Sequence, residues 1–279
     1  MKTLFVPTDL SSHSLVALRY ALELIKVSDV DRLIYFHINP QPITQEIPVL
    51  YMDDLQKVNE EIADHLKHEL KECMLKAGIS RPIITDVMVT TDVGPITAIP
   101  EFAHKHKSDL IVMGTHGNTG LDRLIFGSVT AGVLENSKTP VLTIPKHFTF
   151  QPIKKIAFAS SFTSFTLEIK AVLKFCKALH AKLDVIHVDD GLLSEKLIKH
   201  ARRVIKEIDD LNIELHIVQG NLEIKLIETL KKEVSKLDPQ WLVMVPKKTE
   251  WYEKFFLSSK SIEVANHYNR PLLILPFNN

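Results

Sequence analysis

The chain has 279 residues, of which 45% are hydrophobic and 24% are charged, as in an ordinary soluble globular protein. This length predicts two domains, because domains usually hold about 100–200 residues. Lysine and arginine together number 34, and aspartate and glutamate also number 34, so the formal net charge is zero. A neutral chain is not typical of a dedicated nucleic-acid or membrane-surface binder. No apolar run reaches the roughly 20 residues that a membrane span needs.

The cysteines and the first residues favour the cytoplasm. Cys73 and Cys176 lie far apart and have no partner motif, so we interpret them as reduced, buried thiols. Asp9 interrupts the apolar start of the chain, so we do not expect a secretory signal.

In the first half of the chain, short apolar runs alternate with segments of helical periodicity. We expect strands over residues 3–8, 32–38, 84–90, 109–115 and 140–145. We expect helices over residues 12–26, 53–76, 96–106 and about 128–136, where apolar residues recur at steps of three and four. Apolar strands that are each followed by a helix predict a parallel sheet covered on both faces.

The second half repeats the same order of segments. Residues 154–161, 183–188, 241–246 and 271–276 correspond to residues 2–9, 33–38, 110–115 and 140–145. The offset is 152 residues at the first strand and 131 residues from Met113 to Pro140. About twenty residues are therefore missing around the second helix of the second copy. This repeat predicts α/β domains over residues 1–147 and 148–279, each a doubly wound parallel five-stranded sheet.

Glycine is concentrated in one segment. The chain has nine glycines, and five of them lie within 19 residues: Gly114, Gly117, Gly120, Gly127 and Gly132. This segment follows the fourth expected strand, at the carboxyl edge of the sheet, where open α/β folds bind ligands. Glycine lets the backbone approach a ligand closely, and a helix that begins at Gly127-Ser128 offers unpaired N–H groups to an anion. The hydroxyls of Ser128 and Thr130 add neutral donors.

The segment therefore predicts a phosphate site without a lysine, although a glycine-rich turn that only caps a helix would give the same pattern. It is neither a Walker loop nor a dinucleotide fingerprint, because GxxxxGK[ST] and GxGxxG are both absent.

The segment contains the motif G-x2-G-x9-G-[ST], formed by Gly114, Gly117, Gly127 and Ser128. Pro7-Thr8-Asp9 follows the first expected strand, and His37-Ile38 ends the second. On these residues the chain resembles the ATP-binding universal stress proteins, as a tandem pair of their domains. The resemblance implies an adenine nucleotide alpha hydrolase-like fold, with two domains paired through their last strands as an intramolecular pseudo-dimer. A homo-oligomer remains an alternative.

The resemblance also implies an ATP site in the first domain, with Mg²⁺ as the accompanying ion. The base and ribose would be lined by Pro7, Thr8, Asp9 and Ile38. The loop beside the ribose and phosphates would consist of Met113, Gly114, His116 and Gly117. The triphosphate would be held by Gly127, Ser128, Val129 and Thr130. Asp9 suits either the ribose hydroxyls or an indirect contact with Mg²⁺.

The function that the resemblance implies is that of a stress-response regulator or sensor rather than an efficient enzyme. Two alternatives stay open at this point. One is a nucleotide-free interaction scaffold, and the other is a weak ATP hydrolase in which His116 and Asp9 take the active role.

The second half departs from the motif. At the equivalent positions it has Ser161 for the aspartate, and Val245, Lys248 and Ser258 for three of the glycines. Only the serine after the last glycine is kept, as Ser259. Side chains at these positions would obstruct phosphates, so we expect this domain to keep the fold and to have lost the nucleotide.

Histidine is the other residue type that could indicate a functional site, such as a metal site. His65 with His68 and His104 with His106 lack a metal-binding pattern, so we expect exposed histidines there. His37 recurs as His187 in the second copy, which predicts a structural role at the edge of the sheet. Residues 39–54 could form a lid, a partner surface or a loop packed on its own domain.

Overall fold

The computed structural model describes residues 1–40, 50–92, 94–115, 127–189, 195–208, 212–220, 226–245 and 270–276. These residues divide into two compact units, with the division between residues 146 and 147.

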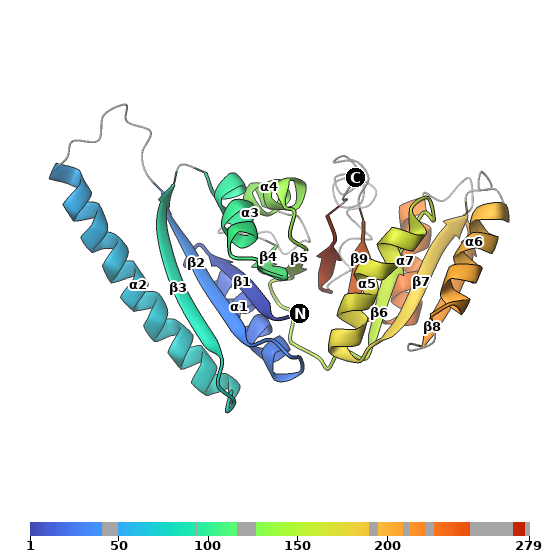
Figure 1. Cartoon of the computed structure of the whole chain (residues 1–279), viewed down its shortest axis with the longest axis horizontal. Coiled ribbons are helices and arrows are strands. Elements are labelled where there is room, and N and C mark those ends of the chain that lie inside the picture. The colour runs from blue at the N-terminus through green and yellow to red at the C-terminus, as the bar shows by residue number, and fades with distance from the viewer. Residues whose placement is uncertain are drawn as a thin grey trace. The chain divides into compact units, whose positions relative to one another are not determined.

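The first unit has a parallel sheet with helices on both faces (Figure 1). Its strands are β1 (Thr3–Thr8), β2 (Arg32–Pro40), β3 (Ile84–Asp92), β4 (Leu110–Gly114) and β5 (Val141–Ile144). They lie in the order β3-β2-β1-β4-β5, and every pair is parallel. Its helices are α1 (Ser12–Lys26), α2 (Leu50–Ala77), α3 (Pro95–Lys105) and α4 (Ser128–Asn136). Helix α1 packs against α2, and α3 packs against α4, as expected for a doubly wound fold.

The second unit repeats this topology. Its strands are β6 (Lys155–Ala159), β7 (Lys182–Asp189), β8 (Ile213–Gln219), β9 (Trp241–Met244) and β10 (Leu272–Ile274). Their order is β8-β7-β6-β9-β10, again with parallel pairs only. Its described helices are α5 (Phe165–Leu179), α6 (Glu195–Lys206) and α7 (Leu226–Leu237). Helix α6 has 12 residues where α2 has 28, which agrees with the expected deletion around the second helix.

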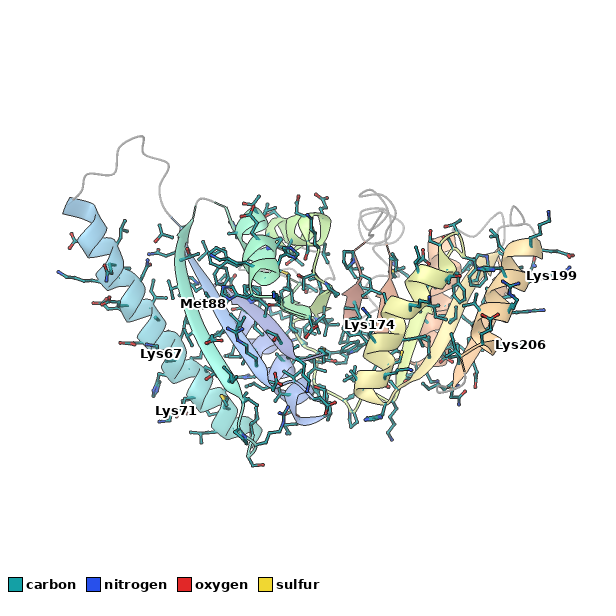
Figure 2. All side chains as sticks on the ribbon, viewed as in Figure 1. Lys67, Lys71, Met88, Lys174, Lys199 and Lys206 are labelled. Atoms are coloured by element: carbon teal, nitrogen blue, oxygen red, sulfur yellow. The ribbon has the colours of Figure 1, made fainter. Side chains whose placement is uncertain are left out.

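The local sequence explains where the main helices begin and which side they bury. The hydroxyl of Ser11 accepts the N–H of Ser14 and caps the start of α1. In α2, Leu66 and Leu70 are buried, whereas Lys67 and Lys71 are exposed and project from the helix in Figure 2. This alternation is the amphipathic spacing from which the helix was predicted.

The predicted fold class is confirmed, and the bounds of β1, α1 and α4 agree with the prediction. Strands β2 and β3 each run two residues further than predicted, to Pro40 and Asp92. They extend together because residues 38–40 pair with residues 90–92. The pairing of the two domains through their last strands stays a prediction. In the part of the chain that the structure describes, no helix is both long and apolar enough to cross a bilayer.

Candidate functional site

Those predicted site residues of the first unit that the structure describes lie at the carboxyl edge of its sheet. Strand β1 lies between β2 and β4, and Thr8 at its end lies beside His37 of β2. On the other side, β4 ends with Met113 and Gly114, which pair with the last residues of β5. Because all these strands are parallel, their carboxyl ends meet along one edge.

Hydrogen bonds hold the turn after β1 in one conformation. The Thr8 hydroxyl lies 2.9 Å from the Ser14 hydroxyl and accepts the N–H of Leu10 at 3.1 Å. The Thr8 carbonyl oxygen lies 2.9 Å from Nδ1 of His37. Asp9 is exposed and accepts the N–H of Ser11 on Oδ1 at 3.0 Å. The turn therefore presents the Asp9 carboxylate on a rigid base.

Among the described residues, no side chain caps the backbone donors at the start of helix α4. Gly127 is its N-cap residue, and the first turn has no acidic side chain. The first helical hydrogen bond runs from the N–H of Ala131 to the carbonyl of Gly127. The N–H groups of Ser128, Val129 and Thr130 precede this bond, and in an α-helix such groups lack an intrahelical partner. Together with the helix dipole, they form a local environment that favours an anion.

Thr130 differs from the prediction in one respect. Its hydroxyl is buried and donates to the Gly114 carbonyl at 3.0 Å. Because the hydroxyl proton is used in this bond, it is not available to a phosphate, and only the Thr130 N–H is. The bond instead ties the start of α4 to the end of β4. A second bond does the same, since the N–H of Gly127 donates to the Thr115 carbonyl at 2.9 Å.

The reason for glycine at two positions also lies in packing. A Cβ on Gly114 would lie 3.0 Å from the carbonyl oxygen of His13, at the start of α1. A Cβ on Gly132 would lie 2.6 Å from Cγ2 of Ile96 in α3. A side chain at Gly114 would thus crowd the neighbouring helix whether or not a ligand approaches. No pattern in the sequence identified His13 as the residue that causes this crowding.

Some predicted residues lie outside the described part of the chain. These are His116, Gly117 and Gly120 of the glycine segment, residues 41–49 of the predicted lid, and Lys248, Ser258 and Ser259 of the second half. Within the described part, Pro7 and Met113 are buried, Ile38, Gly127 and Val129 are partly buried, and Ser128 is exposed. Ser128 is thus exposed at the start of α4.

The two equivalent histidines have the same structural role. Nδ1 of His187 lies 2.8 Å from the Ser160 carbonyl oxygen, as Nδ1 of His37 does from that of Thr8 at 2.9 Å. Each ring therefore links the end of the second strand of its unit to the end of the first. In the second unit, Ser161 stands in place of Asp9, and its hydroxyl bonds that of Thr163 at 3.0 Å.

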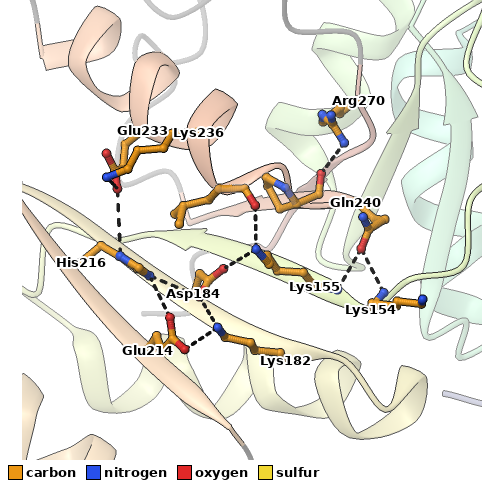
Figure 3. Close-up of polar contacts among 12 residues, drawn as sticks. Lys154, Lys155, Lys182, Asp184, Glu214, His216, Glu233, Lys236, Gln240 and Arg270 are labelled. Carbon is orange, nitrogen blue, oxygen red and sulfur yellow. Dashed lines mark hydrogen bonds and ion pairs between the residues drawn. The ribbon is translucent and has the colours of Figure 1, made fainter.

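A cluster of charged side chains in the second unit was not predicted. Asp184 is fully buried on β7, and its Oδ1 lies 3.2 Å from Nε2 of His216 on β8 (Figure 3). Glu214 is its neighbour across the strands and lies 2.5 Å from Nζ of Lys182. Nζ of Lys155 lies 3.8 Å from Oδ2 of Asp184.

Asp184, Glu214 and His216 form the one group of three potential metal ligands found among the described residues. However, Lys155 and Lys182 already neutralise these carboxylates, and each lysine is the first residue of its strand. The cluster therefore lies toward the amino ends of the strands, away from the edge where Ser161, the counterpart of Asp9, lies. We interpret it as an ion-pair cluster that makes a buried aspartate tolerable.

The remaining candidates are structural or solvent-facing. His65, His68 and His104 are exposed, and the ring of His106 stacks on Phe102. Both cysteines are buried free thiols, as predicted. Burial raises the pKa of the Cys176 thiol to about 12, which leaves it protonated at neutral pH.

Comparison with known proteins places this architecture in a family. The model of the universal stress protein family matches residues 1–145. Universal stress protein MJ0531 of Methanocaldococcus jannaschii is 34% identical over 152 residues, which cover 52% of this chain and 82% of that protein. Universal stress protein MJ0577 of the same organism is 27% identical over 155 residues, which cover 52% of this chain and 95% of that protein.

A solved structure is similar over the whole chain. The crystal structure of a universal stress protein from Archaeoglobus fulgidus superposes with a TM-score of 0.65 at 20% identity, covering 99% of this chain and 97% of that one. This likeness concerns the fold. With the family match over the first half and the relative at 34% identity, it leads to one conclusion: the chain belongs to the universal stress protein family.

Proposed function

We propose that the first unit binds ATP, together with Mg²⁺, at the carboxyl edge of its sheet. The observation that carries the proposal is the start of α4, where three backbone N–H groups precede the first helical bond and the first turn itself carries no acidic side chain. Such an end attracts a polyphosphate without a lysine. The bonds from Thr130 and Gly127 to the end of β4 hold these donors in place before the ligand arrives.

The base and ribose would lie at the ends of β1 and β2. There the base and ribose would contact Pro7, Thr8, Asp9 and Ile38. On the side of β4 they would contact Met113 and Gly114. The exposed Asp9 carboxylate suits the ribose hydroxyls or a water bound to Mg²⁺, and its Oδ1 is oriented by the N–H of Ser11. His116 and Gly117 belong to the proposed site through the sequence motif alone.

The role that we propose is regulation or sensing in the stress response, in the cytoplasm. Binding of the nucleotide would change the contacts of the chain with partners rather than drive rapid turnover. The pairing of the two domains within one chain belongs to the same proposal, and so does the loss of the nucleotide from the second domain.

A negative charge introduced at the N-cap of α4 tests the proposal. Gly127 has φ −59° and ψ 158°, a conformation open to any residue. Aspartate and asparagine both cap helices well, so Gly127→Asp and Gly127→Asn should fold equally well. Only Gly127→Asp places a negative charge where the phosphates would lie.

Because a side chain at Gly127 obstructs the phosphates and caps the same N–H groups, we expect both variants to bind MgATP more weakly than the unmodified chain in calorimetric titrations. We expect Gly127→Asp, which also adds a negative charge, to bind much more weakly than Gly127→Asn. Equal affinities of the two variants for MgATP would contradict the proposal that the phosphates bind at this helix end. The absence of binding in the unmodified chain would instead favour the nucleotide-free scaffold. Turnover above roughly 1 s⁻¹, in the ordinary range for enzymes, would favour the hydrolase.

A further inference from the structure

The turn between β1 and α1 has a backbone conformation that needs support from its neighbours. Leu10 has φ of 61°, in the left-handed region that leucine rarely adopts. Such a residue keeps its conformation only where the surrounding structure holds it. The N–H of Leu10 donates to the Thr8 hydroxyl at 3.1 Å, and the N–H of Ser11 donates to Oδ1 of Asp9 at 3.0 Å. The Thr8 hydroxyl is therefore one of the groups that fix the backbone beside Asp9.

The Thr8 hydroxyl is itself placed among buried polar groups. It lies 2.9 Å from the hydroxyl of Ser14 on α1, and both residues are buried. Val6 pairs with Tyr35, so the side chains of Thr8 and Tyr35 lie on the same face of the sheet. Burial raises the pKa of Tyr35 most, the hydrogen bond to Glu69 raises it further, and the Thr8 hydroxyl lowers it. A hydroxyl lowers this pKa by donating to the phenol oxygen, so Thr8 and Tyr35 are in contact.

A carboxylate on α2 orients the Tyr35 phenol. Tyr35 is fully buried, and its hydroxyl donates to Oε1 of Glu69 at 2.6 Å. A carboxylate only accepts, so this bond uses the phenol proton and leaves the phenol oxygen as an acceptor for the Thr8 hydroxyl. Glu69, Tyr35 and Thr8 therefore form a series of polar contacts that leads from α2 to the turn.

The second unit has no tyrosine at the equivalent position. The register puts Val185 in the place of Tyr35, because Val185 pairs with Phe158 as Tyr35 pairs with Val6. Valine carries no hydroxyl, so the turn of the second unit cannot be supported in this way.

A different carboxylate supports the turn of the second unit. Ser160 corresponds to Thr8, and its hydroxyl accepts the N–H of Phe162 at 3.0 Å. The same hydroxyl donates to Oε2 of Glu168 on α5 at 2.9 Å, and Glu168 is buried. The equivalent position in the first unit is the apolar residue Val16. Each unit therefore supplies one helical carboxylate that orients the hydroxyl under the turn, and in the first unit it acts through a tyrosine.

We propose that Tyr35 and Glu69 are positioning residues of the candidate site, which hold the turn that carries Asp9. The effect on a nucleotide rests on the proposed function, whereas the support of the turn needs no ligand. Tyr35 is fully buried, so it acts through Thr8 and not by touching the ligand. Without the phenol hydroxyl, the acceptor of the Leu10 N–H is less well oriented, and the Asp9 carboxylate loses its fixed place.

Hydrogen exchange of the turn, followed by NMR, is the first arm of the test. Tyr35→Phe keeps the buried ring and removes only the hydroxyl. We expect the Leu10 amide to exchange roughly threefold faster or more in this variant, because it loses part of its support. Tyr20→Phe is the matched control, since Tyr20 is a buried tyrosine in the middle of α1, and it should leave the Leu10 amide unchanged. Unchanged exchange of Leu10 in a folded Tyr35→Phe variant would overturn the proposal.

Binding is the second arm, and two ligands separate the turn from the start of α4. MgATP would contact both, whereas tripolyphosphate without Mg²⁺ would contact only the amides of α4. In calorimetry, we expect Tyr35→Phe to weaken MgATP binding by roughly three- to tenfold and to leave tripolyphosphate binding unchanged. A general loss of structure would weaken the binding of both ligands equally, and that result would also overturn the proposal.

Two variants of Glu69 test the origin of the support. Glutamine keeps an oxygen that accepts the phenol proton, whereas leucine has none. We expect Glu69→Gln to match the unmodified chain in Leu10 exchange and MgATP affinity, and Glu69→Leu to resemble Tyr35→Phe. If Glu69→Leu also matched the unmodified chain in both measurements, Glu69 would have no part in positioning the turn.

The two arms separate this proposal from the proposed function. If the unmodified chain bound no MgATP, the proposed function would fail, and the exchange of the Leu10 amide would still decide whether Tyr35 holds the turn. If MgATP bound equally well with and without the Tyr35 hydroxyl, the proposed function would stand and the positioning role would be wrong.

Discussion

The hydrogen bond of the Thr130 hydroxyl can be removed from the candidate site with little change in the shape of the side chain. Its hydroxyl is buried and donates to the Gly114 carbonyl at 3.0 Å, and valine has nearly the same volume. Thr130→Val therefore deletes the hydrogen bond and leaves a carbonyl without this donor. A lost bond of this kind costs about 1–3 kcal/mol when the remaining partner is buried. Gly114 is only partly buried, so we expect a loss of about 1–2 kcal/mol.

For a unit of this size, about 1–2 kcal/mol corresponds to a fall in melting temperature of roughly 2–8 °C. Differential scanning calorimetry and urea unfolding of the first unit's transition within the whole chain would measure it. Thr130→Ser keeps the hydroxyl and should recover most of the loss. If Thr130→Val were as stable as the unmodified chain, or if Thr130→Ser were equally destabilised, the hydrogen bond would not be what joins α4 to β4.

Three further predictions concern packing, charge and the thiols. Gly132→Ala places a Cβ 2.6 Å from Cγ2 of Ile96, so crowding outweighs the gain in helix propensity. Urea unfolding should therefore show that the free energy of unfolding falls by about 1–2 kcal/mol. A stabilised variant would contradict this packing. The hydrogen bond from Lys182 lowers the pKa of Glu214, so the pair's contribution to stability is complete above about pH 4.3 and is lost as the pH falls through the lowered pKa. Glu214→Gln should therefore flatten the dependence of the free energy of unfolding on pH below about pH 4.3. If this dependence were the same in the variant and the unmodified chain, the ion pair would contribute little to stability. Cys176, with a pKa of about 12, should resist iodoacetamide in the native chain and react on unfolding, as mass spectrometry would show; rapid native labelling would contradict its burial.

Local signals in the sequence were sufficient to predict where several helices begin. Helix α1 begins where Ser11 caps it, and α4 begins after Gly127, so both starts are encoded by neighbouring residues. The last residues of β2 and β3 were missed because they are strands only through pairing with each other, and such pairing over a long sequence separation has no local pattern.

The candidate site, too, could be predicted from the sequence only in part. The spacing of the glycines predicted the helix end, but the neighbours of Gly114 and Thr130 come from contacts distant in sequence. The ion-pair cluster depends on the register that sets Asp184 beside Glu214. One signal for it was present, because an aspartate within the apolar run 183–188 must have a partner if the strand is buried.

The central claim is that backbone amides at the start of α4 hold a polyphosphate. The most direct test is a pair of calorimetric titrations of the whole chain, one with MgATP and one with adenosine. The account predicts one MgATP per chain and a much weaker affinity for adenosine, which lacks the group that the amides bind. Equal affinities for the two ligands, or the absence of MgATP binding, would contradict it.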